Sequence, residues 1–185
     1  MSGIIRFFVR EGDEHNCEWR LRAEALEHEL RVLLRGAALE DSETGLSNNV
    51  QLSRDLSTHL ARLRRRGRTF SVALFDVRDG TAPERDLSWE QAGIAADTLS
   101  GTARREDTVY RVSRHQYAVL LADTDGTGAE RFRERVLESF AAGGARSARL
   151  QFHVRCGVAE APPDLVQTAD LLVAAGDDLA ARPAA

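Results

Sequence analysis

The sequence predicts an α+β domain, and two observations carry this prediction. Two apolar runs, residues 108–112 and 117–122, flank a short polar turn, which is the pattern of a β-hairpin. Two further runs with β-strand character lie on either side of the hairpin, at residues 70–77 and 150–158, and segments with helix signals separate them. The order helix, strand, helix, hairpin, helix, strand, helix implies an antiparallel sheet flanked by helices.

Composition narrows the class of protein. The chain has 185 residues, 43% hydrophobic and 29% charged, which is enough apolar content for one domain plus an extension. Its formal net charge is −4, so no domain-wide basic surface predicts nucleic-acid binding. All 25 basic residues are arginine, so no single arginine carries much functional weight by itself. Cys17 and Cys156 lack metal-ligand spacing, and no apolar stretch has membrane-spanning length, so we expect a cytoplasmic protein without a membrane partner.

The first 40 residues are expected to form a leader, residues 1–10, and a helix over residues 11–40. The apolar residues of this helix alternate spacings of four and three, which is the heptad pattern of a coiled coil. They are Trp19, Ala23, Leu26, Leu30, Leu33 and Ala37. The narrow seam favours a parallel helix pair and hence a homodimer. Because the seam covers few heptads, an amphipathic helix packed on its own domain remains the alternative.

Turn formers in residues 41–48 end this first helix, and the next helix is expected over residues 50–66. The strand at residues 70–77 is the best candidate for the centre of the sheet, and it carries Asp76 near its end. The expected domain extends from there to about residue 180.

Capping signals mark the remaining helices. Ser88–Gln91 is a capping box that opens a helix ending near Gly101. After the hairpin, Thr127–Glu130 reads as a second capping box, with its helix ending near Phe140. Asp164 is expected to cap the last helix.

Five separate segments, in the correct order, resemble the GGDEF family of diguanylate cyclases. Residues 41–48, Asp-Ser-Glu-Thr-Gly-Leu-Ser-Asn, resemble the family's opening motif, Asp-x-Leu-Thr-Gly-Leu-x-Asn. The hairpin turn, Ser113–Tyr117, stands where the family has Gly-Gly-acid-Glu-Phe. Arg155–Ala159 is similar to the family's Ser-Ile-Gly-Val-Ala, and Ala169–Asp170 to its late Ala-Asp. The resemblance covers residues 41–180 and implies a polymerase-palm-like antiparallel sheet flanked by helices.

The resemblance also implies a degenerate domain that has lost catalysis. In the family, carboxylates from the first strand and the hairpin hold a divalent metal. Asp76 matches the first, whereas His115, a poor ligand for Mg²⁺, replaces the second. Ser113 and Arg114 replace the glycines that approach phosphate, and Arg78 replaces the second strand-end carboxylate. We expect no catalytic residues and no metal site, with Asp76 a solvated strand end and the turn exposed. A two-ligand transition-metal site of Asp76 and His115 is a weak alternative.

One functional element of the family is kept. Arg104 and Asp107 stand at the spacing of its inhibitory Arg-x-x-Asp site, where the family binds cyclic di-GMP by charge-assisted, forked hydrogen bonds. Arg135 lies where the family places a second ligand arginine, Arg131 is one turn before it, and Arg105 is the remaining candidate. The competing structural interpretations are a turn-capping role for Asp107 and a solvated helix face for the later arginines.

We therefore predict a cytoplasmic, catalytically inactive GGDEF domain that acts as a cyclic di-GMP receptor. It would need no other cofactor and would signal to an unidentified protein partner. The alternative is a ligand-free scaffold that keeps only the fold and binds proteins or dimerises.

Overall fold

The computed structural model describes residues 39–146 and 151–182. These belong to the second of two units into which the chain divides, residues 38–185. The expected leader and almost all of the expected helix over residues 11–40 lie outside the described residues. The coiled coil, and the homodimer that depends on it, therefore stay predictions.

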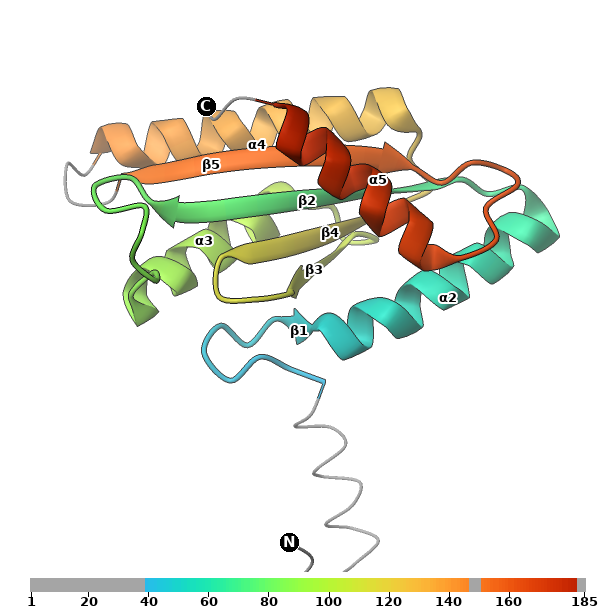
Figure 1. The fold of residues 1–185 in the computed structure, drawn as a ribbon, viewed down its shortest axis with the longest axis horizontal. Coiled ribbons are helices and arrows are strands. Elements are labelled where there is room, and N and C mark those ends of the chain that lie inside the picture. Colours follow the sequence, from blue (N-terminus) through green and yellow to red (C-terminus); the bar gives the residue numbers. More distant parts are fainter. Residues whose placement is uncertain (1–38, 147–150, 183–185) are drawn as a thin grey trace, which may run out of the picture. The chain divides into compact units, whose positions relative to one another are not determined.

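The helices and strands follow one another in the predicted order, with one short strand added (Figure 1). In chain order they are β1 (Ser47–Asn48), α2 (Asn49–Arg66), β2 (Phe70–Asp79), α3 (Trp89–Thr102), β3 (Thr108–Arg111), β4 (Gln116–Ala122), α4 (Gly126–Arg146), β5 (Phe152–Glu160) and α5 (Thr168–Ala181). No helix among the described residues is both long enough and apolar enough to cross a bilayer.

The five strands form one sheet in the order β1-β3-β4-β2-β5. The antiparallel arrangement predicted from the sequence is confirmed for β2 to β5. It is wrong for β1, which runs parallel to β3 and pairs Ser47 with Tyr110 and Asn48 with Arg111. The reason is that the loop predicted over residues 41–48 straightens at its end and extends along the edge of the sheet. The sheet is therefore mixed.

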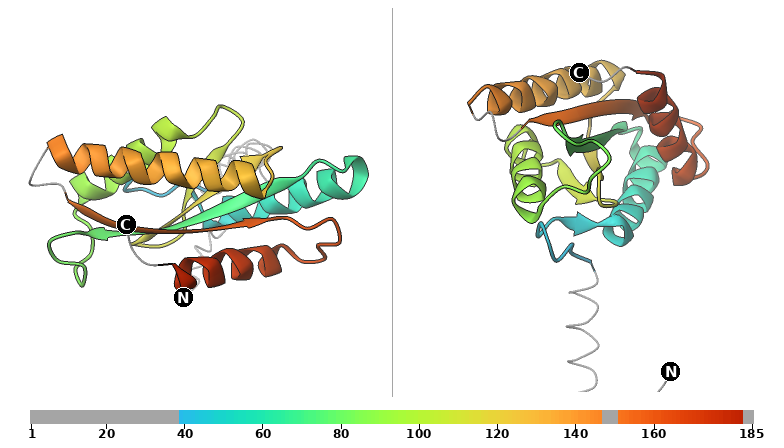
Figure 2. Two further views of the ribbon diagram at one scale, coloured as in Figure 1. Left: turned by 90° about the horizontal axis from the view of Figure 1, so that it is seen from above. Right: turned by 60° about the vertical axis from the view of Figure 1, so that its left-hand side comes forward.

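Helices cover both faces of the sheet (Figure 2). Phe75 and Val77 of β2 point to the face covered by α3 and α4, where they join the larger apolar core. Phe70 and Val72 point to the opposite face, covered by α2 and α5. This alternation is the period of two that a strand buried on both sides requires, and it confirms the predicted α+β class.

One of the three predicted helix starts is confirmed. The Ser88 hydroxyl accepts from the amide of Gln91 at 3.2 Å, and the Gln91 side chain accepts in return from the amide of Ser88 at 2.9 Å. The predicted box at Thr127–Glu130 is wrong, because α4 has already begun at Gly126 and Asp125 caps it by accepting from the amide of Gly128 at 2.7 Å. The predicted cap at Asp164 is also wrong, because α5 begins only at Thr168.

Gly157 fixes the distance between β5 and α5. A Cβ atom at this position would lie 2.2 Å from the carbonyl oxygen of Ala175 and 2.2 Å from the amide nitrogen of Leu179. Only glycine permits so close an approach of helix to strand. The carboxylate of Asp178, in the same helix, accepts from the amide of Val158 at 2.8 Å. Together these contacts hold β5 in place next to Arg155.

Candidate functional site

Asp76 lies at the carboxyl end of the central strand β2 and is bound by two arginines. Its side chain is only 4% exposed. Arg155 donates to it from Nη2 at 2.8 Å, and Arg78 donates from Nε at 3.1 and 3.2 Å to its two oxygens. Burial raises the pKa of the Asp76 carboxyl, but the hydrogen bonds from Arg155 and Arg78 outweigh burial and leave this pKa below its ordinary value. The expectation of a solvated strand end is therefore wrong.

The hairpin turn is held against the loop that follows β2. Arg114 and His115 both approach the carboxylate of Asp86, with His115 Nε2 at 3.0 Å from Oδ1. Arg114 is exposed, as predicted, but His115 is only 21% exposed, so the prediction of an exposed turn is wrong there. The Nδ1 atom of His115 is buried and has no hydrogen-bond partner in the described structure. The turn is thus fixed by ion pairs in which Asp86 takes part.

Arg111 joins the hairpin to the segment before β1. Its side chain is 5% exposed and lies 2.6 Å from a carboxylate oxygen of Glu43 and 3.3 Å from one of Asp41. The same guanidinium donates to the carbonyl oxygens of Ser113 and Arg114, both at 3.3 Å. It also lies over the Tyr117 ring, 5.8 Å from the centroid. One buried cation therefore connects two segments that are about seventy residues apart.

The residues at the family's metal position do not suit a divalent cation. Asp76 is occupied by two guanidinium groups, and the Nε2 atom of His115 faces Asp86. In the described parts of the chain, no three His, Cys, Asp or Glu side chains gather in a way that could hold a metal ion. Mg²⁺ requires several oxygen ligands at about 2.0–2.1 Å in octahedral geometry. The structure thus gives Asp76 and His115 other partners than a shared transition metal.

Asp107 shapes the loop between α3 and β3. Its Oδ2 accepts from the backbone amide of Arg104 at 2.9 Å, and its Oδ1 accepts from the amide of Ala122 at 3.2 Å. The amide of Asp107 donates to the carbonyl oxygen of Arg104 at 3.1 Å. The turn-capping role considered for Asp107 is therefore present. These bonds hold the Arg104–Asp107 loop against the end of β4.

The arginines of this loop are free to meet a ligand. Arg104 and Arg105 are both exposed, and within residues 39–146 and 151–182 their guanidinium groups have no hydrogen-bond or ion-pair partner. Two unpaired cations thus lie on a loop whose backbone is fixed by Asp107. This arrangement suits an anionic ligand with a hydrogen-bonding edge.

Arg131 and Arg135 are exposed on α4, the helix that packs beside α3. The guanidinium of Arg135 lies over the Phe132 ring, 5.5 Å from its centroid. The end of α3 approaches α4 one turn further on, where Thr102 meets Ser139 with their hydroxyl oxygens 3.5 Å apart. The loop with Arg104 and the part of α4 with Arg135 therefore belong to neighbouring elements on the same face of the sheet.

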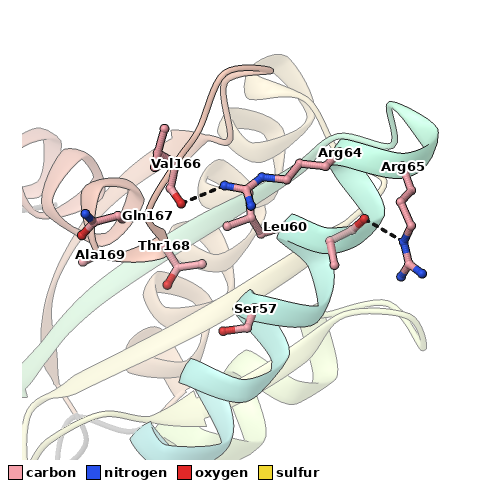
Figure 3. Close-up of a pocket in the computed structure, with 9 residues that line it drawn as sticks. Ser57, Leu60, Arg64, Arg65, Val166, Gln167, Thr168 and Ala169 are labelled. Atoms are coloured by element: carbon pink, nitrogen blue, oxygen red, sulfur yellow. Dashed lines mark hydrogen bonds between the residues drawn. The ribbon is translucent and has the colours of Figure 1, made fainter.

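A separate hollow lies between α2 and the start of α5 (Figure 3). Its volume is about 600 Å³, and small or apolar side chains such as Ser57, Ala61 and Val166 line much of it. Arg64 donates from Nη2 to the carbonyl oxygens of Leu165 and Val166 and thereby ties the loop before α5 to α2. Val166 is 70% exposed. Sequence reasoning did not identify this hollow, because its residues come from segments about a hundred positions apart.

Sequence reasoning also missed the partners of Asp76 and of the hairpin turn. Arg78 was within reach of that reasoning, because residues two apart on a strand share a face. Arg155 becomes visible only when the β2–β5 register is known, since it pairs directly with Asp76. Asp86 lies in a loop without a regular pattern and gave no signal.

Comparisons with solved structures identify the fold. The structure is similar to the diguanylate cyclase SiaD of Pseudomonas aeruginosa, solved in complex with its activator SiaC, with a TM-score of 0.69 and 22% identity over 90% of this chain and 66% of that one. The coiled coil and GGDEF domain of DgcB from Caulobacter crescentus, in complex with c-di-GMP, gives a TM-score of 0.68 at 19% identity over 90% and 91%. The GGDEF domain of FimX from Pseudomonas aeruginosa gives 0.67 at 17% identity over 77% and 91%.

These likenesses, each below 25% identity, show the fold alone. The predicted palm-like architecture is confirmed, because the mixed five-stranded sheet and its flanking helices match the GGDEF-domain fold. No protein-family model matches the sequence, and a search of curated proteins finds no match. The chain spans just under two thirds of the length of the SiaD chain.

Proposed function

We propose that this chain is a catalytically inactive GGDEF domain that binds cyclic di-GMP and signals to a protein partner. The observation that carries the proposal is the pair of unpaired, exposed guanidinium groups of Arg104 and Arg105 on a loop fixed by Asp107. We further propose a cytoplasmic location and a homodimer formed through the helix expected over residues 11–40.

The chemistry of the loop suits the proposed ligand. Cyclic di-GMP offers two phosphates and two guanine edges, so it suits forked cationic donors next to one carboxylate. An ionised carboxylate has about four lone-pair sites, and Asp107 uses two of them for backbone amides. The remaining sites can accept the guanine N–H groups. Since the loop backbone is already fixed, little conformational entropy is lost when the ligand binds.

Arg135 and Arg131 extend this site onto α4. Both are exposed, and α4 lies next to the helix that leads into the Arg104 loop. The Arg135 guanidinium rests on an aromatic ring, which positions it without using its N–H donors. In our proposal Arg135 donates to the ligand from the same or a neighbouring subunit.

The proposed loss of cyclase activity rests on the hairpin and on Asp76. The turn Ser113–Tyr117 has neither the glycines nor the carboxylate of the family motif, and its His115 faces Asp86. Asp76 is bound by Arg78 and Arg155. We expect no cyclic di-GMP from GTP with Mg²⁺ or Mn²⁺, even after the turn is replaced by Gly-Gly-Asp-Glu-Phe.

Two of the similar structures support the class of ligand and the existence of a protein partner. DgcB was solved with c-di-GMP and SiaD with an activator protein. Those ligands belong to those proteins, and for this chain they support a proposal only.

The test is calorimetry of the full chain with cyclic di-GMP, GTP and cyclic di-AMP. A hydrogen bond to a charged group contributes about 1.5–3 kcal/mol, so Arg104→Ala should weaken cyclic di-GMP binding about tenfold to a hundredfold. Arg85→Ala is the control, because Arg85 is exposed and its side chain has no partner in the described structure. Equal affinity in wild type and Arg104→Ala would remove the receptor role.

The second candidate function is a protein-binding scaffold without a nucleotide ligand. The hollow between α2 and α5, with the exposed Val166 at its edge, favours it. Calorimetry separates the two functions, because the scaffold predicts no heat with any of the three nucleotides.

A further inference from the structure

The carboxylate of Asp76 carries its own cations. It is almost fully buried, at 3% exposure of the residue, and a buried carboxylate without compensation is strongly unfavourable. Arg155 and Arg78 reach it at 2.8 and 3.1 Å, and both donate to the same oxygen, Oδ2. Arg78 also donates to the other oxygen, Oδ1, at 3.2 Å. One negative charge is therefore matched by two positive charges.

The strands determine this contact before any ligand arrives. Asp76 and Arg155 are directly paired residues of the antiparallel strands β2 and β5. Directly opposite residues have Cβ atoms about 4.5–5.5 Å apart, so their side chains meet without movement of the backbone. Arg78 is two residues further along β2 and shares the face of Asp76. Arg78 is also held by the carbonyl oxygen of Pro83, at 3.3 Å from Nη1.

A divalent cation at the same carboxylate would meet repulsion and too few ligands. The cluster of one carboxylate and two guanidinium groups has a net charge of +1, so a second cation is repelled. Arg78 occupies the position at which the resemblance places a second carboxylate of the strand. On the hairpin side, His115 is directed to Asp86. No oxygen ligand close to Asp76 is left to complete an octahedral shell.

We propose that Arg78 and Arg155 are the permanent counter-ions of Asp76 and replace the divalent metal of a catalytic GGDEF domain. The folded domain then neither binds Mg²⁺ or Mn²⁺ at this carboxylate nor depends on them for stability. The inference rests on the proposed loss of catalysis, but it does not rest on cyclic di-GMP binding. It makes Asp76 part of the framework that holds β2 to β5.

The test uses metal alone, without nucleotide, on the full chain. After EDTA treatment, the melting temperature of the wild type and its Mn²⁺ binding in electron paramagnetic resonance are measured with and without MgCl₂ or MnCl₂. We expect the same melting temperature in all three conditions and no bound Mn²⁺. Asp76→Asn should lower the melting temperature equally with and without metal, since the arginines lose their partner.

A designed variant tests the same inference from the other direction. Arg78→Asp combined with Arg155→Ala removes both cations and adds a carboxylate on the face of Asp76, so Mn²⁺ should now bind and raise the melting temperature. The matched control is Arg85→Asp with Arg66→Ala, which changes net charge equally at exposed positions without a carboxylate partner among the described residues. This control should not respond to metal.

The outcomes are distinct. A metal-dependent rise in melting temperature of the wild type that is lost in Asp76→Asn would overturn the inference, and so would a designed variant that folds but ignores Mn²⁺. If the designed variant does not fold, the wild type and Asp76→Asn decide the question. Failure of cyclic di-GMP binding in calorimetry would remove the receptor proposal and leave this result unchanged.

Discussion

Replacing Arg111 with alanine should destabilise the domain more than any exposed arginine does. The substitution removes ion pairs to Glu43 and Asp41 at 2.6 and 3.3 Å, together with two weaker hydrogen bonds to backbone carbonyls at 3.3 Å. Loss of a partner from a fully buried ion pair costs about 3–5 kcal/mol. Here Asp41 and Glu43 are 27% and 36% exposed, so water compensates part of that cost. We expect a loss of about 2–3 kcal/mol in the free energy of unfolding.

Urea and thermal unfolding at neutral pH, followed by circular dichroism, measure this loss. For a domain of this size, 2–3 kcal/mol corresponds to a decrease of about 4–12 °C in the melting temperature. Arg111→Lys should recover part of the stability, because it keeps the charge and loses the fork. Arg85→Ala is the control and should stay within about 0.5 kcal/mol of the wild type. If Arg111→Ala also stays within that range, Arg111 does not connect the hairpin to the segment before β1 in the way that we describe.

Two further predictions concern acid stability and assembly. The pKa values of the carboxyls of Asp41, Asp76 and Asp178 lie below their ordinary values, because hydrogen bonds and arginines outweigh the effect of burial. Their stabilisation is present above the unfolded pKa and is lost as the pH falls through the folded pKa, so the free energy of unfolding should decrease below about pH 4 in urea titrations. A decrease no smaller in Asp76→Asn than in the wild type would contradict the part assigned to Asp76. Replacing Leu26 and Leu30 by Asp should convert a dimer into monomers in light scattering, and an unchanged mass would favour an intramolecular role for the seam.

Local patterns were sufficient to predict most of the fold. The hairpin and β2 follow from apolar runs and turns, and the Ser88 capping box depends on residues only three apart. β1 has only two residues and pairs with β3 across about sixty positions, so no local pattern announces it. The cap of α4 was misplaced because Asp125 and Thr127 are both acceptable caps, and only the backbone geometry selects between them.

The two parts of the candidate site differ in how far the sequence could describe them. The Arg104–Asp107 loop is contiguous, so its residues were identified, and the structure added that Asp107 holds the backbone while the two arginines have no partners. The environment of Asp76 depends on Arg155, which is 79 positions away. Strand register is a property of the whole sheet, so this contact could not be read from either strand alone.

The ligand loop and the former metal position differ in the state of their charges. At the metal position the charges compensate one another within the chain, through Asp76 with its two arginines and through Asp86 with Arg114 and His115. At the loop, the Asp107 carboxylate binds backbone amides, so the guanidinium groups of Arg104 and Arg105 are left without a counter-charge in the described structure. Charges paired within the chain stabilise the fold and offer little to a ligand, whereas uncompensated cations on a fixed loop favour an anion from outside. This contrast is why we place the ligand of this domain at the Arg104–Asp107 loop and not at the hairpin.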